Sequence, residues 1–172
     1  KIRTIPDFPK KGIMFRDITP LFQDKDSLKK LTDLFYEKYK GVEIDIIAGI
    51  ESRGFILAGI LAEKLNTGLV LIRKPGKLPH ETIKQEYSLE YRTDTLEMHK
   101  DSIKLGQRVL VVDDLIATSG TMCASCDLIN KLGGKIIECA SIIELEDLCG
   151  RKKIEDKGHN VFSILSFKED EL

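Results

Sequence analysis

Two neighbouring carboxylates, Asp113 and Asp114, follow the apolar run VLVV at residues 109–112. A carboxylate accepts hydrogen bonds and donates none, and neither face of a covered parallel sheet tolerates it unpaired. Because side chains alternate faces along a strand, the two aspartates could not serve one ligand from within it. We therefore expect the pair to mark the carboxyl end of a strand, where open α/β sheets bind ligands. Such a pair suits the hydroxyl groups of a sugar or a metal ion.

The segment after the aspartates is a loop of small and hydroxyl-bearing residues that leads into a helix. It consists of Ala117, Thr118, Ser119, Gly120 and Thr121. The free N–H groups of the first helical turn, the positive end of its dipole and the hydroxyls together suit a phosphate monoester. A 5-phosphorylated ribose would present both a phosphate and a pair of hydroxyls. For an isolated aspartate pair, a helix N-cap beside a solvated acidic turn is the alternative interpretation.

Cationic residues follow two further strand-like runs. Ser52 and Arg53 come after a run that ends at residue 50 and open a helix, so they share the strand-end geometry of the aspartates. Arg73, Lys74 and Lys77 surround a Pro-Gly pair after the next run. Cations and backbone donors at strand ends can hold a densely charged anion. A solvated basic turn is the alternative for the second group.

The elements that must position these residues alternate between strand and helix. Strands are expected at residues 43–50, 68–74, 108–114, 135–145 and 160–167. Helices are expected at residues 27–39, 54–65 and 121–134. Nearly wholly apolar strands that alternate with helices predict an α/β fold with a doubly wound, mainly parallel sheet and helices on both faces.

Two segments depart from that alternation. In residues 75–105, Ile83 and Tyr87 fall on one side of a half-polar strand, together with Leu89 and Tyr91, and a second strand is expected around Leu96 and Met98. We interpret this excursion as a mobile β-ribbon, a flexible lid. Residues 1–22 contain three prolines and show no clean period, so we expect an irregular flap or hood segment.

Length and composition exclude several classes of protein. The 172 residues suit one domain, and 27 basic against 28 acidic residues give no field that would recruit nucleic acid. No apolar run approaches the roughly 20 residues that span a bilayer, and the first residues lack the apolar core of a signal peptide. We therefore expect a cytoplasmic protein with no membrane or nucleic-acid partner. The four cysteines are expected to be thiols, with Cys123 and Cys126 as small core residues.

The string VLVVDDLIATSGT resembles the phosphoribosyl-pyrophosphate (PRPP) motif of type I phosphoribosyltransferases, which usually carry Gly where this chain has Ser119. Five further segments resemble the adenine phosphoribosyltransferase family, in that family's order. They are PDFPKKGIMFRDITPLF, IAGIESRGFILAGILA, LIRKPGKLP, YSLEYRTDTLEMHKD and ECASIIELEDLCGR. The resemblance implies Mg²⁺-dependent transfer of 5-phosphoribosyl from PRPP to adenine N9, which gives AMP and pyrophosphate in purine salvage by a homodimer. It implies that Mg²⁺ is held mainly through PRPP, with Asp113 as a candidate protein ligand.

The same resemblance implies roles for individual residues in handling PRPP. The aspartate pair would hold the ribose hydroxyls and residues 117–121 the 5-phosphate. The residues implied to hold pyrophosphate, partly across a subunit boundary, are Ser52, Arg53, Arg73, Lys74, Lys77 and Tyr91. Arg53 would also take part in catalysis. Glu90 matches a lid glutamate that would exchange a proton with the purine, and Arg92 stands where the family usually has Gly.

For the base, the resemblance implies a pocket made largely by the flap. Phe15 would stack on adenine, Met14 would pack beside it and the main chain of Arg16 would contact the adenine edge, while Leu145 would close the opposite face. Plain core packing is the alternative for these apolar residues. Backbone contacts would let a pocket without a dedicated polar side chain still select adenine.

Three other functions remain open at this point. The first is a phosphoribosyltransferase for hypoxanthine, guanine or orotate, because the Asp113 and Asp114 loop is common to the class. The second is a transcriptional regulator that keeps the PRPP site as a sensor, although the near-neutral chain offers no obvious basic face. The third is a receiver-like signalling domain, in which the acidic pair would hold Mg²⁺ beside a phosphorylated aspartate.

Overall fold

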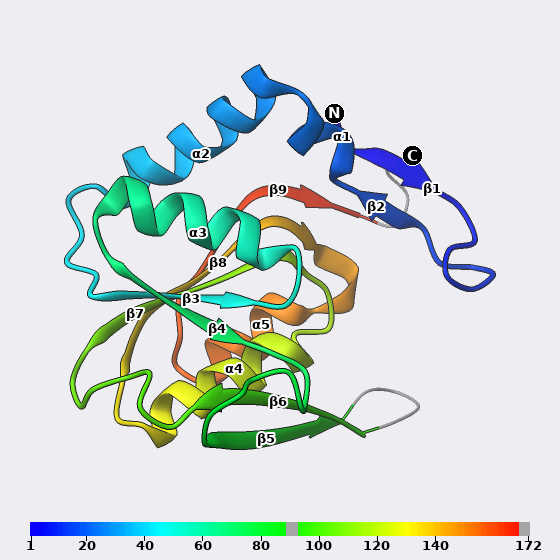
Figure 1. Ribbon diagram of the computed structural model, residues 1–172. Helices are drawn as coiled ribbons and strands as arrows, with labels where there is room; N and C mark the ends of the chain where they lie inside the picture. Colours follow the sequence, from blue (N-terminus) through cyan, green and yellow to red (C-terminus); the bar gives the residue numbers. More distant parts are fainter. Residues whose placement is uncertain (89–92, 169–172) are drawn as a thin grey trace. The chain divides into compact units, whose positions relative to one another are not determined.

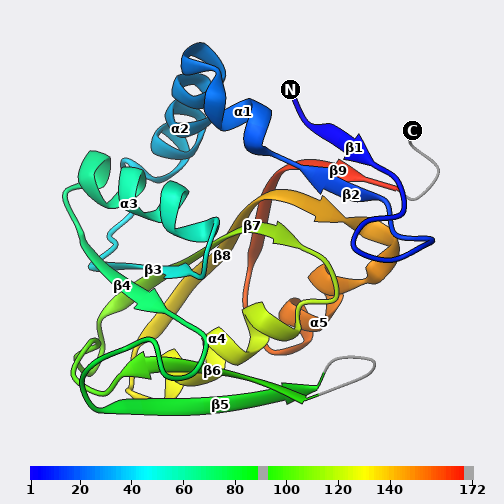
Figure 2. The same cartoon turned by 45° about the vertical axis from the view of Figure 1, so that its right-hand side comes forward.

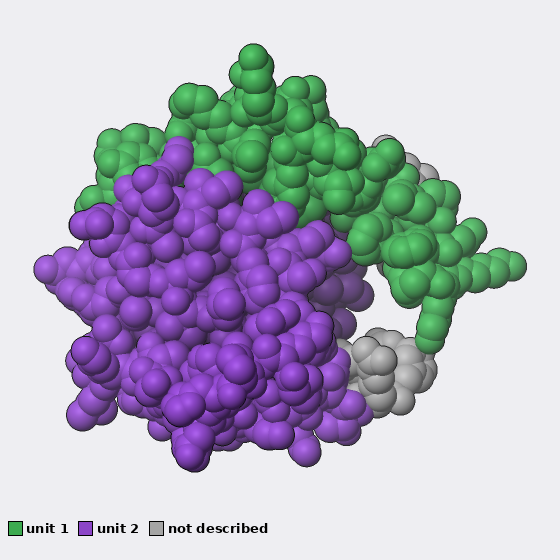
Figure 3. Space-filling model, viewed as in Figure 1, with its two compact units in different colours: residues 1–41, 169–172 green, residues 42–168 purple. Residues whose placement is uncertain are grey.

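Five apolar runs form a parallel sheet in the strand order β4-β3-β7-β8-β9 (Figure 1). The computed structural model describes residues 1–88 and 93–168. It contains two compact units, residues 1–41 and residues 42–168, which are coloured separately in Figure 3. The sheet belongs to the second unit. Its strands are β3 (Ile46–Ile50), β4 (Gly68–Ile72), β7 (Arg108–Ile116), β8 (Lys135–Leu145) and β9 (Val161–Phe167).

Helices cover both faces of this sheet, which confirms the predicted doubly wound α/β class. Helix α3 (Gly54–Leu65) lies on one face, and helices α4 (Gly120–Lys131) and α5 (Gly150–Asp156) lie on the other (Figures 1 and 2). The central strands are apolar on both faces because each face is covered: residues 109–112 of β7 are fully buried. A short 3₁₀ helix, η1 (Glu146–Leu148), joins β8 to α5.

The predicted ribbon is present as two antiparallel strands, β5 (Thr82–Ser88) and β6 (Thr93–His99). Leu96 and Met98 of β6 are buried, as the sequence predicts for its second strand. Backbone hydrogen bonds between Arg73 and Glu97, at 2.9 and 2.7 Å, join the ribbon to the chain just after β4. Leu89 and Tyr91, which were expected on the same side of the first strand, lie outside the described residues. The mobility of the ribbon stays a prediction.

The first unit contains two short strands and two helices. Strand β1 (Arg3–Ile5) pairs antiparallel with β2 (Phe15–Asp17), and the chain continues into α1 (Thr19–Gln23) and α2 (Lys25–Tyr39). Asp24 caps α2 by accepting a hydrogen bond from the Ser27 N–H at 2.9 Å, which satisfies an N–H of the first turn. The helix therefore begins two residues before the predicted start at residue 27.

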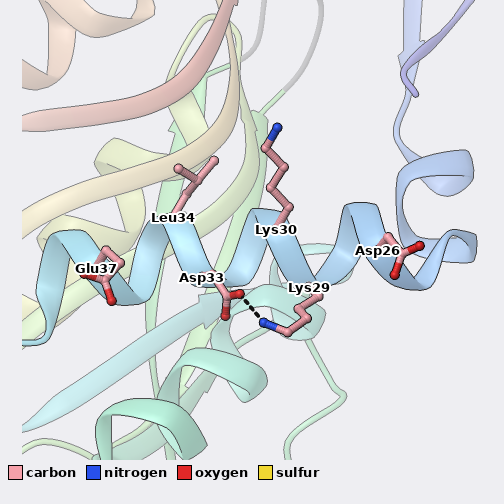
Figure 4. A pocket seen from close by; sticks show the side chains of 6 residues that line it. All are labelled: Asp26, Lys29, Lys30, Asp33, Leu34 and Glu37. Atoms are coloured by element: carbon pink, nitrogen blue, oxygen red, sulfur yellow. Dashed lines mark hydrogen bonds and ion pairs between the residues drawn. The ribbon is translucent and has the colours of Figure 1, made fainter.

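Helix α2 buries one stripe of side chains and exposes the other. Leu31, Phe35 and Tyr39 are buried, whereas Leu34 is 47% exposed. Figure 4 shows Leu34 in a shallow hollow among charged side chains of the same helix, where Lys29 pairs with Asp33. Since one helix supplies this whole hollow, we interpret it as an ordinary solvated face. Among the described residues, no helix is long and apolar enough to cross a membrane.

Candidate active site

A cavity of about 350 Å³ lies at the carboxyl ends of β3, β4 and β7. Its lining consists of Glu51, Ser52, Arg53, Lys74 and residues 113–122. It thus unites the aspartate pair, the hydroxyl-bearing loop and three of the predicted pyrophosphate-binding residues. The strand ends meet there because parallel strands present all their carboxyl termini at one edge of the sheet. The position of the site agrees with the sequence prediction.

The aspartates do not end their strand, and that expectation was wrong. Strand β7 continues to Ile116, where it still pairs with β8, but its pairing with β3 stops at Val112. One side of β7 is therefore open from Asp113 onward. Both Asp113 and Asp114 line the cavity from within the strand. Whether both carboxylates serve one ligand stays a prediction.

The two carboxylates differ in their electrostatic surroundings. Asp114 accepts a hydrogen bond from Arg53 Nε at 2.5 Å, so its charge is paired. Asp113 accepts one from the Asp114 N–H at 2.8 Å. Loss of water contact and the neighbouring Asp114 carboxylate raise the pKa of Asp113 well above its usual value. Of the two carboxyl groups, the ionised form of Asp113 would be stabilised more by a hydrogen-bond donor or a cation that enters the cavity.

The loop after β7 contains a strained residue, Ser119, which has a left-handed backbone with φ of +66°. Glycine, which the family usually has at this position, adopts positive φ without a steric cost. The Ser119 hydroxyl oxygen is buried and has no hydrogen-bond partner in the described structure. The residues that follow it, Gly120, Thr121 and Met122, form the first turn of α4 and line the cavity.

Gly150, which the sequence analysis missed, packs closely against this loop. A Cβ atom at Gly150 would lie 2.0 Å from the Ala117 carbonyl oxygen and 2.4 Å from the Ser119 hydroxyl oxygen. Only glycine therefore allows α5 to approach the loop this closely. Lys153 of α5 also donates a hydrogen bond to the Thr118 carbonyl at 3.2 Å. The close contact could not be seen in the sequence because Gly150 is 31 positions from Ser119 and 33 from Ala117.

Glu51 is a second residue that the sequence analysis left without a role. Its carboxylate accepts hydrogen bonds from Arg73 Nη2 at 3.1 Å, the Lys74 N–H at 2.9 Å and Lys77 Nζ at 2.6 Å. Burial opposes ionisation of Glu51, but these donors outweigh it and lower the pKa of Glu51 to about 2. Glu51 thereby ties the basic turn after β4 to the turn after β3. The peptide bond between Glu51 and Ser52 is cis.

This arrangement separates the three cations of the basic turn. Lys74 lines the cavity, whereas Arg73 and Lys77 contact Glu51 and are not among the described residues of the lining. Arg73 donates a further hydrogen bond to the Lys77 carbonyl at 3.2 Å. A role for Arg73 and Lys77 in pyrophosphate binding stays a prediction.

The remaining predicted site residues lie outside the described residues or belong to different compact units. Glu90 and Tyr91, and also Arg92, lie outside the described residues. Leu145 ends β8 in the second unit, while Met14, Phe15 and Arg16 belong to the first. Within the first unit, the Phe15 ring makes an edge contact with Phe8, with 5.1 Å between centroids, and Arg16 Nη1 donates a hydrogen bond to Thr4 at 2.5 Å. The adenine pocket stays a prediction.

The cysteines are all free thiols, as expected. Cys126 of the C-x-x-C pair is fully buried and its sulfur lies 3.4 Å from that of Cys139, which is also buried. Cys123 is half-buried. No group of three or more His, Cys, Asp or Glu side chains that could hold a metal ion occurs in residues 1–88 and 93–168.

Comparison with known proteins decides the family. Residues 18–171 match the phosphoribosyl transferase domain. The adenine phosphoribosyltransferase of Geotalea daltonii is 55% identical to this chain over 166 residues, which are 96% of either protein. The chain belongs to the adenine phosphoribosyltransferase family. Membership of a phosphoribosyltransferase family agrees with an aspartate pair and a hydroxyl-bearing loop on one cavity, and it disfavours a receiver-like signalling domain.

Solved structures of the same family share the fold. The crystal structure of adenine phosphoribosyltransferase from Thermoanaerobacter pseudethanolicus is 48% identical to this chain, with a TM-score of 0.93, and the match covers 96% of this chain and 95% of that one. The Saccharomyces cerevisiae enzyme, crystallised with an imino-altritol bisphosphate and adenine, is 39% identical with a TM-score of 0.89 over 95% and 94% of the two chains. This chain is thus a pentosyltransferase with the type I phosphoribosyltransferase fold.

Proposed function

We propose that this protein transfers the 5-phosphoribosyl group of PRPP to N9 of adenine, which gives AMP and pyrophosphate in purine salvage. The observation that carries the proposal is one cavity of about 350 Å³ in which Asp113, Asp114, Arg53, Lys74 and the loop at residues 117–121 converge. These groups match the hydroxyls, the 5-phosphate and the pyrophosphate of PRPP. The choice of adenine rests on relatives that carry the name adenine phosphoribosyltransferase.

In this mechanism, the carboxylates bind and orient the ribose. Asp113 and Asp114 accept hydrogen bonds from its two hydroxyls, while residues 117–121 and the first turn of α4 hold the 5-phosphate. As the bond between the anomeric carbon and pyrophosphate breaks, positive charge develops on the ribose. Carboxylates held beside the ring favour that charge distribution over the neutral ground state.

The leaving pyrophosphate would be held by the cationic part of the cavity, which includes Arg53, the partner of Asp114. Ser52, Arg53 and Lys74 already line this part of the site. Arg53 acts in catalysis because its guanidinium stabilises the charge that accumulates on the leaving group. Arg73 and Lys77 would contribute once the ligand competes with Glu51 for them. Tyr91 would add a further contact.

Binding of adenine in this mechanism depends on residues 1–22 and 75–105. Their positions relative to the cavity are part of the proposal. Residues 1–22 act as a flap that brings Met14, Phe15 and Arg16 to the base, opposite Leu145. Residues 75–105 act as a lid that carries Glu90. Glu90 exchanges a proton with the purine as N9 attacks, and closure excludes water. In this proposal, residues 1–172 function as a single domain.

Magnesium fits the site as a companion of PRPP. Mg²⁺ prefers oxygen ligands and is commonly held by one or two carboxylates together with substrate phosphates. The site offers the half-buried carboxyl group of Asp113, whose pKa is raised by loss of water contact and by Asp114, and which a nearby cation would help to ionise. Bound Mg²⁺ would neutralise part of the charge on pyrophosphate. Asp113 would serve as the protein ligand while PRPP supplies most of the others.

We also propose a homodimer in the cytoplasm with no nucleic-acid or membrane partner. The strand at the β4 edge of the sheet exposes Leu69 and Leu71, and the neighbouring helix α3 exposes Ile56. Apolar side chains grouped at a free sheet edge are typical of a protein interface. Four free thiols agree with a reducing compartment.

The decisive experiment offers the purified protein PRPP and Mg²⁺ with adenine, hypoxanthine, guanine or orotate in separate reactions. Chromatography then follows nucleotide and pyrophosphate. AMP formed from adenine alone supports the proposal, whereas product from another base assigns a different acceptor. If no base gives product although PRPP binds with micromolar affinity by calorimetry, the site serves as a sensor.

A further inference from the structure

Tyr87 of the ribbon meets two parts of the cavity that lie far apart in the sequence. Its hydroxyl accepts a hydrogen bond from Lys74 Nζ at 3.0 Å and one from the Thr121 hydroxyl at 3.4 Å. It donates one to Asp94 at 3.3 Å. A phenolic hydroxyl offers one donor and two acceptor sites, so these contacts use all three. Lys74 and Thr121 both line the cavity.

The contact with Lys74 fixes a side chain that would otherwise be flexible. Lys74 Nζ also forms an ion pair with Asp94, which lies opposite Tyr87 in the ribbon. Burial disfavours the charged amine, but the hydrogen bonds to Asp94 and Tyr87 outweigh this and raise the pKa of Lys74. A charged lysine with four methylene groups is thereby held in one position at the cavity.

The ring of Tyr87 contacts the other end of the cavity. A Cβ atom at Gly120, the first residue of α4, would lie 3.0 Å from Cδ2 of the Tyr87 ring. The ring thus packs directly on the loop that precedes and opens α4. Packing by the ring and hydrogen bonding by the hydroxyl are separate contributions, and replacing tyrosine by phenylalanine removes only the second.

We propose that Tyr87 is a positioning residue for PRPP: its hydroxyl sets the spacing between the Lys74 amine and the loop at Thr121. This inference rests on the proposed function, in which Lys74 binds pyrophosphate and the loop binds the 5-phosphate. PRPP carries those two groups on opposite sides of its ribose. A residue that fixes the distance between their binding sites therefore favours a ligand that has both, without touching that ligand itself.

The test measures steady-state kinetics and PRPP binding for Tyr87→Phe, with Tyr36→Phe on α2 as the matched control. We expect the KM and Kd for PRPP to rise about ten-fold in Tyr87→Phe, which is about 1.4 kcal/mol and corresponds to one hydrogen bond. The KM for adenine and kcat should stay within about two-fold of wild type. The Tm should stay within about 2 °C, since the ring packing remains. Tyr36→Phe should change none of them.

A double-mutant cycle shows whether Tyr87 acts through Lys74. In a Lys74→Met background, the effect of Tyr87→Phe on the KM for PRPP should shrink from about ten-fold to less than about three-fold. Full additivity overturns the inference, as does a Tyr87→Phe protein with unchanged KM for PRPP or with a loss confined to Tm. If the wild type is active and Tyr87→Phe has the same KM for PRPP, only the role of Tyr87 is rejected. A wild type that fails to bind PRPP would reject the proposed function as well.

Discussion

At the scale of single residues, Asp113 is the group that we propose favours ligand binding over stability. Its pKa is raised by loss of water contact and by Asp114, so its ionised form is costly in free energy. A ribose hydroxyl or a cation would remove that cost. Residues tuned in this way gather at functional sites because binding needs groups that the fold itself does not satisfy.

Replacing Asp113 with Asn should therefore weaken function and strengthen the fold. We expect the Kd for PRPP to rise about 10- to 100-fold, as for the loss of a charged hydrogen bond. The Tm at pH 7 should rise by roughly 2–4 °C. A raised folded-state pKa means that stability falls as pH rises through it, so the Tm gain should vanish as pH falls toward about 4. Calorimetry checks both, with the exposed Asp101→Asn as a control that should change neither.

Ser119 carries two costs that glycine would avoid. A left-handed backbone is unfavourable for serine, and its buried hydroxyl lacks a hydrogen-bond partner in the described structure. Ser119→Gly should raise the free energy of unfolding by about 1 kcal/mol. This is the net effect after subtracting the destabilisation that comes from the higher entropy of glycine in the unfolded chain. Ser119→Ala keeps the backbone strain and should be less stable than Ser119→Gly in urea unfolding. The opposite order would show that the backbone at residue 119 is not strained.

At the scale of elements, the carboxyl ends of β3 and β4 are joined through Glu51. Its hydrogen bonds with Arg73, Lys74 and Lys77 hold the basic turn against the turn that carries Ser52 and Arg53. One carboxylate therefore connects the two cationic segments of the site. This coupling explains why a carboxylate stands among cations in a cavity proposed to bind pyrophosphate.

Glu51→Gln should loosen that junction. We expect the free energy of unfolding at pH 7 to fall by about 1–2 kcal/mol, because the partners are cationic but partly exposed. The pKa of Glu51 is depressed to about 2, so its contribution is present above the unfolded value near 4.3 and is lost as pH falls toward 2. The difference from wild type should shrink over that interval in urea titrations. Glu81→Gln, which breaks an exposed pair with Lys100, serves as the control and should cost much less.

The same elements show where sequence patterns suffice. The helix at residues 54–65 and the strand at residues 135–145 have the bounds that their apolar runs predict. The strand that carries Asp113 was predicted to end at residue 114 because charges are excluded from a covered sheet, yet the shorter β3 leaves this part uncovered on one side. The exposure of this part of β7 depends on where the neighbouring strand ends. That depends on the tertiary structure and cannot be inferred from the residues of β7 alone.

At the scale of the whole molecule, the site was predictable where residues are contiguous and was missed where distant segments meet. The aspartate pair and its loop form one string, so their chemistry is visible in the sequence. Glu51 meets partners 22 to 26 positions away, and Gly150 contacts a loop about 30 positions before it. Their types are ordinary and only the fold gives them a role. The position of the proposed adenine-binding segments relative to the cavity belongs to this same scale.

The proposed dimer makes the last prediction. Leu69 and Leu71 are 43% and 36% exposed on the edge strand β4, which leads directly into the basic turn at Arg73. An interface there would bury these side chains and bring that turn to a second subunit. Replacing both leucines with Lys should give a monomer by light scattering at about 10 µM and reduce turnover, since charges oppose burial in an interface. Leu105→Lys, at an 88% exposed position, should remain dimeric. A wild-type monomer with full activity would rule out a shared site.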